Sequence, residues 1–144
     1  MAVDRTPRSH LPWDLQPRPL VRGAIAYLVI AVPSALVISL THGNDTPGQE
    51  SNFWVLAAVL VLLVAPVIGG FVAGAANLTA PLSHAAAAVG IPAAIFLFIR
   101  IIVGLARGTL TAGQVMSFLL YLVVFVGLAV VGGYLAFRHR SGTT

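Results

Sequence analysis

Three polar residues stand within or beside long apolar stretches of this chain, and they are its best candidates for chemistry: Asn77, His84 and Arg100. An asparagine amide can hold a substrate, and a histidine can relay protons near neutral pH. An arginine in apolar surroundings can pair with a group on another subunit. Each residue also has a simpler interpretation. Asn77 can cap a helix or a hairpin, His84 can be solvated or bonded to the backbone, and the long Arg100 side chain can extend to a polar boundary.

A second polar group lies in the turn-rich segment 42–52, where His42, Asp45 and Glu50 are possible metal ligands by residue type. Their spacing is not helical and no fourth ligand is nearby, so we expect a solvated loop and no metal site. The chain has no cysteine, which excludes disulfides and thiolate-bound metals or clusters. No catalytic triad or H-E-x-x-H motif is present, and Asn77, His84 and Arg100 do not form a recognisable catalytic set. We therefore expect neither an enzyme nor a cofactor.

The composition indicates what kind of protein carries these residues. Of 144 residues, 58% are hydrophobic and 8% are charged, whereas a soluble domain has roughly 25% charged residues. Four apolar runs, each long enough to cross a bilayer, are predicted at about 21–40, 53–76, 82–104 and 116–137. The sequence thus predicts an all-α integral membrane protein, a four-helix transmembrane bundle built from antiparallel up-down hairpins.

The arginines predict the orientation of this bundle. Only Arg100 and Arg107 fall on the side opposite the termini, and six arginines fall on the terminal side: Arg5, Arg8, Arg18, Arg22, Arg138 and Arg140. Because positive residues accumulate in the cytoplasm, both termini are expected there. The formal charge of +4 therefore indicates orientation and not nucleic-acid binding. Arginine without lysine, together with abundant Ala, Gly and Val, suggests GC-rich coding of an actinobacterial type. We expect a multi-pass protein of the cell membrane, in a bacterium the inner membrane.

The chain divides into two tails and one membrane domain. Residues 1–19 are rich in proline and arginine, and we expect an extended cytoplasmic tail there. Residues 20–138 form the transmembrane domain, and 139–144 form a short cytoplasmic tail. Trp13 and Leu15 stand out in the first tail. Either this segment rests at the headgroup level, or it docks onto a larger partner.

Small residues predict how the helices pack. Gly70-x-x-x-Gly74 is a small-xxx-small pattern, which lets membrane helices approach closely. The expected packing residues are Gly69, Gly70, Ala73 and Gly74 on the second span and Ala86, Gly90 and Ala94 on the third. Because the link 77–81 is short, we expect the third span to be the main partner of the glycine face, with a right-handed crossing. The fourth span also has small residues near its end: Ala129, Gly132, Gly133 and Ala136.

The segment Gly69-Gly70-Phe71-Val72-Ala73-Gly74 ends the second span, and after a short link Ser83-His84 opens a span rich in small residues. This arrangement resembles small four-span bacterial membrane proteins of uncharacterised function. Those proteins often have His-Gly where this chain has His84-Ala85. The resemblance covers about a third of the chain, and it implies a fold but no activity.

None of the four predicted spans contains Asp or Glu, although proton- and cation-coupled carriers generally need a carboxylate within the membrane. Two functional classes remain. We favour a structural or accessory subunit, which packs against a larger membrane complex or self-associates. The alternative is an oligomeric permease or channel for a small solute or ion. The expected partners are the lipid bilayer and either other membrane subunits or further copies of this chain, with no nucleic acid.

Overall fold

The structure is a computed structural model that describes residues 15–42, 53–77 and 79–142. The described part contains four helices and no strand: α1 (Pro17–His42), α2 (Phe53–Ala76), α3 (Pro81–Ala106) and α4 (Ala112–Ser141). All four are long and apolar enough to cross a membrane. The prediction of an all-helical protein with four candidate spans is therefore confirmed.

Three helices are longer than the predicted spans, and α1 shows why at its start. It begins at Pro17, so Pro17 and Pro19 lie in its first turn and not in the extended tail where we expected them. Proline is well tolerated in a first turn, because the backbone N–H groups there have no intrahelical acceptor. Proline density alone therefore placed the helix start too late. In contrast, α2 has the predicted bounds of 53–76.

The turn between α3 and α4 is tighter than predicted. Gly108 adopts φ 64°, a left-handed conformation that favours glycine, and its N–H donates to Leu105 O at 3.1 Å. Helix α4 then begins at once, because Thr111 and Gln114 form a capping box: each side chain accepts a hydrogen bond from the other residue's backbone N–H. These caps explain why α4 starts before the predicted residue 116.

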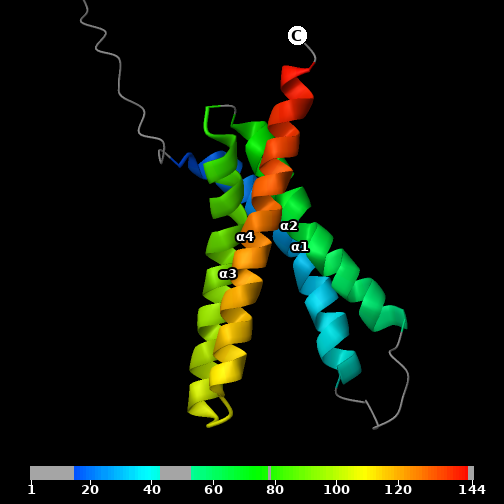
Figure 1. The fold of residues 1–144 in the computed structure, drawn as a ribbon, viewed down its shortest axis with the longest axis vertical. Helices are drawn as coiled ribbons and strands as arrows, with labels where there is room; N and C mark the ends of the chain where they lie inside the picture. The colour runs from blue at the N-terminus through cyan, green and yellow to red at the C-terminus, as the bar shows by residue number, and fades with distance from the viewer. Residues whose placement is uncertain (1–14, 43–52, 78, 143–144) are drawn as a thin grey trace, which may run out of the picture.

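The helices alternate in direction along the chain, so that α1 and α3 run one way and α2 and α4 run the other (Figure 1). The start of α1, the α2–α3 link and the end of α4 consequently lie at one end of the molecule, called here the terminal end. The hairpins α1–α2 and α3–α4 lie against one another at this end and diverge toward the opposite end (Figure 1).

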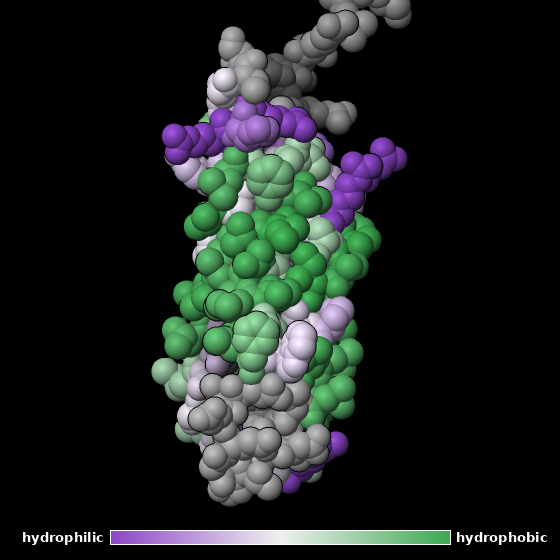
Figure 2. All heavy atoms as spheres, turned by 90° about the vertical axis from the view of Figure 1, so that its right-hand side faces the viewer, coloured by the Kyte–Doolittle hydropathy of each residue, from purple (hydrophilic) through white to green (hydrophobic). Residues whose placement is uncertain are grey.

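The buried core is small and lies mainly toward the terminal end. Its central cluster consists of Tyr27, Ala31, Ala65, Val89 and Ala129. Tyr27 of α1 meets Phe125 of α4 edge to face, with ring centroids 6.4 Å apart. Large apolar side chains instead cover the exterior, where Figure 2 shows a broad hydrophobic band below a hydrophilic cap. Small residues inside and large apolar residues outside are the pattern expected of helices packed in lipid.

Candidate functional site

His84 is the centre of a polar cluster at the terminal end and is fully buried. Its Nδ1 lies 2.8 Å from the carbonyl oxygen of Ala80. A carbonyl oxygen can only accept, so Nδ1 carries the proton and donates it. The other ring nitrogen, Nε2, is then an acceptor. It receives hydrogen bonds from the Gln16 backbone N–H at 2.9 Å and from the Asn77 side-chain amide at 3.1 Å.

Asn77 connects this histidine to the α2–α3 link. Its Nδ2 donates to His84, and its Oδ1 accepts from the backbone N–H of Thr79 at 3.0 Å and from the Thr79 hydroxyl at 2.7 Å. An asparagine that bonds the backbone two residues ahead stabilises a turn. This geometry agrees with the interpretation that Asn77 caps the hairpin, since both the nitrogen and the oxygen of its side chain are hydrogen-bonded within the chain.

The cluster of Gln16, Asn77, Thr79, Ala80 and His84, called here the His84 cluster, joins three helices. Gln16 directly precedes α1, Asn77 directly follows α2, and His84 lies in the first turns of α3. The histidine contacts one backbone amide, one side-chain amide and one carbonyl, none of which exchanges protons readily at neutral pH. Within the described part of the chain, no buried side-chain nitrogen or oxygen lacks a hydrogen-bond partner. The geometry therefore favours a clamp over a proton relay.

The glycine face of α2 packs against α4, so the expectation that α3 is its main partner was wrong. A Cβ added to Gly70 would overlap the backbone carbonyl of Ala129, and one added to Gly74 would lie 2.9 Å from Gly133 Cα. Gly70 and Gly74 are four residues apart, and so are Ala129 and Gly133. The two helices run in the same direction, which lets these equal spacings meet in register.

Helix α1 occupies the neighbouring face of α2. A Cβ on Gly69 would lie 2.7 Å from Tyr27 Cβ, and one on Gly23 would lie 2.6 Å from Ala73 Cβ. Gly69 and Ala73 therefore face α1, whereas Gly70 and Gly74 face α4. The small residues Gly69 and Ala73 on one face of α2, and Gly70 and Gly74 on the next, let this helix approach α1 and α4 closely at the same level along its axis.

The small residues of α3 that make contacts differ from those predicted. Ala94 is exposed and Ala86 is only half-buried, so the predicted packing residues Ala86, Gly90 and Ala94 do not form a buried face toward α2. A Cβ on Gly90 would lie 3.1 Å from a methyl group of Val126 on α4. The buried alanines of α3 are Ala85 and Ala88, which lie opposite Gly133 and Gly23. The predicted packing residues of α3 are therefore rotated about the helix axis, by part of a turn, from the residues that make the contacts.

The remaining candidates lie away from the His84 cluster. Arg100 is exposed on α3, six residues before the helix ends at Ala106, and that end of α3 lies opposite the termini (Figure 1). Leu15 lies just before α1 and is 42% exposed. Trp13, Asp45 and Glu50 fall outside the described residues, and so does the side chain of His42. Among the residues that are described, no group of three or more His, Cys, Asp or Glu could hold a metal ion.

Sequence reasoning missed several residues that complete these contacts. Gly23 and Tyr27 were not singled out, because one glycine near a helix start forms no visible pattern. Their spacing does continue to Ala31, which gives a buried column at every fourth position. The small residues of α4 were noted but not assigned as the partner of α2. Their matching four-residue spacing would have indicated it.

Comparisons with protein-family models, with curated proteins and with solved structures gave no match. The resemblance to small four-span bacterial membrane proteins stays a prediction.

Proposed function

We propose that this chain is a multi-pass membrane protein whose four helices all cross the bilayer, with both termini in the cytoplasm. The length and apolar exterior of the helices support the crossings. The orientation is supported by the arginines, because Arg18, Arg22, Arg138 and Arg140 lie at the terminal end and the α3–α4 turn has only Arg107. A bacterial inner membrane fits the composition.

Within that membrane, the protein acts as a structural or accessory subunit without catalytic chemistry. The observation that carries this proposal is the closed contact between α2 and α4, where Gly70 meets the backbone of Ala129 and Gly74 meets that of Gly133. Backbone contact at this closeness leaves no space for a solute between the two helices. The buried polar groups beside it are bonded to one another in the His84 cluster.

The positions of the acidic residues in the sequence also support a structural role. The four helices contain no Asp or Glu, and the acidic residues of the sequence, Asp4, Asp14, Asp45 and Glu50, fall outside the described residues. A carrier driven by protons or cations would need a carboxylate along its pathway, and these helices supply none. Lateral packing against other membrane subunits, or between copies of this chain, is the function that this architecture serves best.

Co-purification from native membranes tests the proposal. The full chain, tagged at its C-terminus and extracted in a mild detergent, should co-purify with another membrane subunit at fixed stoichiometry or run as a self-associated complex that does not conduct. An oligomer that conducts ions or solutes after reconstitution into vesicles would contradict the proposal and support the permease instead.

Two matched variants examine the docking segment within the same experiment. If the N-terminal segment binds the partner, Trp13→Ala should release it, whereas Trp54→Ala, at the other end of the molecule, should not. Equal recovery of the partner with both variants would place the contact on the helices and leave Trp13 at the headgroup level.

A further inference from the structure

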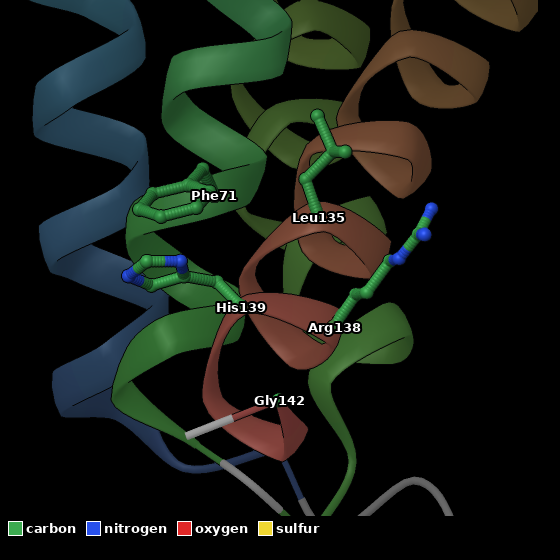
Figure 3. Close-up of a pocket in the computed structure, with 5 residues that line it drawn as sticks. All are labelled: Phe71, Leu135, Arg138, His139 and Gly142. Carbon is green, nitrogen blue, oxygen red and sulfur yellow. The ribbon is translucent and has the colours of Figure 1, made fainter.

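A shallow depression lies at the terminal end between the last turns of α2 and α4. It is lined by Phe71 of α2, by Leu135, Arg138 and His139 of α4, and by Gly142, which directly follows α4. The last four follow the spacing i, i+3, i+4 and i+7, so Leu135, Arg138 and His139 form one face of α4 and the C-cap Gly142 continues it. In Figure 3 the rings of Phe71 and His139 lie on the same flank of α4, and Arg138 extends on the other.

The lining has an apolar part and a basic part. Phe71 and Leu135 are 38% and 45% exposed, so both offer apolar surface to a ligand. Arg138 and His139 follow one turn nearer the end of the helix and are exposed as well. The change from apolar to basic residues thus occurs along the helix axis, in the direction in which a phospholipid changes from acyl chain to phosphate.

The charge around the depression favours an anion. Arg138 and Arg140 lie in the last turns of α4, and Arg18 and Arg22 lie at the start of α1. The carbonyl end of a helix has a partial negative charge equivalent to about half an elementary charge. Arg138 alone carries a full positive charge and outweighs it, and no described residue is acidic. Arginine binds phosphate oxygens through several N–H groups, and histidine can donate one more hydrogen bond.

From this arrangement we propose that the depression binds an anionic phospholipid of the cytoplasmic leaflet. The phosphate lies between Arg138 and His139, which reach it from the two flanks of α4, and the start of one acyl chain lies along Phe71 and Leu135. A free phosphate ion would gain nothing from the apolar part, which is why a lipid is the better ligand. The inference rests on the proposed membrane placement of the chain.

Native mass spectrometry of the purified, detergent-solubilised full chain tests this site. Phosphatidylglycerol should bind more tightly than phosphatidylcholine, and an excess of inorganic phosphate should not displace it. Arg138→Gln should weaken phosphatidylglycerol binding about fivefold, the effect of one arginine near an anionic surface. Arg107→Gln, in the α3–α4 turn at the opposite end, is the matched control and should change binding less than about twofold.

The apolar part has its own pair of variants. Leu135→Ser should weaken phosphatidylglycerol binding, whereas Leu119→Ser should not, because Leu119 is similarly exposed on α4 but far from the depression. The lipid site is refuted if phosphatidylcholine binds equally well, if inorganic phosphate displaces the lipid, or if a control variant weakens binding as much as its partner. If one of these results is obtained and the chain still requires detergent for extraction, the lipid site is rejected, but the proposed membrane placement of the chain is not.

Discussion

The side-chain amide of Asn77 donates a hydrogen bond to Nε2 of His84 across 3.1 Å, and this bond joins the end of α2 to the beginning of α3. The same nitrogen accepts the backbone N–H of Gln16, which fixes the start of α1 to the α2–α3 hairpin. One buried imidazole therefore holds the ends of three helices together. Removing it would leave the Gln16 N–H and the Asn77 amide without this acceptor, whereas the Ala80 carbonyl would keep the Ser83 hydroxyl and the backbone N–H of residue 84 as donors.

The first prediction concerns this clamp. His84→Ala should lower the free energy of unfolding by about 1–3 kcal/mol, because buried polar groups lose their partners. Asn77→Ala should lower it too, and the double variant should reveal a coupling of about 0.6–1.7 kcal/mol, as for other hydrogen bonds between membrane helices. Unfolding in detergent, followed by circular dichroism, measures all three values.

Ser83→Ala is the matched control for the clamp. Ser83 lies beside His84 but bonds only to the nearby carbonyl of Ala80, so its loss should cost less than about 0.5 kcal/mol. Strictly additive effects of Asn77→Ala and His84→Ala would mean that the bond between the two side chains contributes nothing.

The second prediction concerns the contact of α2 with α4. Gly70→Leu should destabilise the protein by about 1–3 kcal/mol, because the new side chain would overlap the backbone at Ala129, which cannot rotate away. Gly127→Leu on α4 is the control. A Cβ at that position meets no atom within 4 Å, and replacing a helical glycine should be neutral or stabilise by up to about 1 kcal/mol. Equal thermal stability of the two variants in detergent would argue against the observed contact.

The third prediction uses the absence of native cysteine to map neighbours. Gly90→Cys combined with Val126→Cys should form a disulfide under mild oxidation, because a Cβ at position 90 lies 3.1 Å from a Val126 methyl group. Gly74→Cys combined with Gly90→Cys should not, since a Cβ at position 74 lies against Gly133 of α4 and meets α3 only at Pro81, nine residues before Gly90. A gel shift distinguishes the pairs, and the reverse result would restore α3 as the main partner of the glycine face.

The fourth prediction concerns Arg100. About six residues of α3 follow it, which at 1.5 Å per residue is about 9 Å, within reach of its side chain. If Arg100 extends to the outer headgroups, Arg100→Lys should change stability and complex formation little, since lysine extends equally well. If Arg100→Lys disrupts a co-purified complex while Arg107→Lys leaves it intact, Arg100 pairs with another subunit.

The helices were predictable from sequence because each apolar run must be long enough to span a bilayer, and α2 was found at its predicted bounds. The helix that packs against Gly70 and Gly74 was not predictable in this way. We assumed that a short link would bring α3 onto that face, but the link restricts only the ends of the helices and not their rotation. The contacts of His84 were even harder to predict from the sequence, because Gln16 is 68 residues away and contributes a backbone group.

The crossing of the membrane by all four helices underlies every proposal for this protein. Labelling with a membrane-impermeant maleimide in intact cells tests it most directly, using single cysteines in a chain that has none. Glu50→Cys and Thr109→Cys should be labelled in intact cells, whereas Ser9→Cys and Thr143→Cys should be labelled only after the membrane is permeabilised. Labelling of Thr143→Cys in intact cells, with Ser9→Cys protected, would contradict the four crossings.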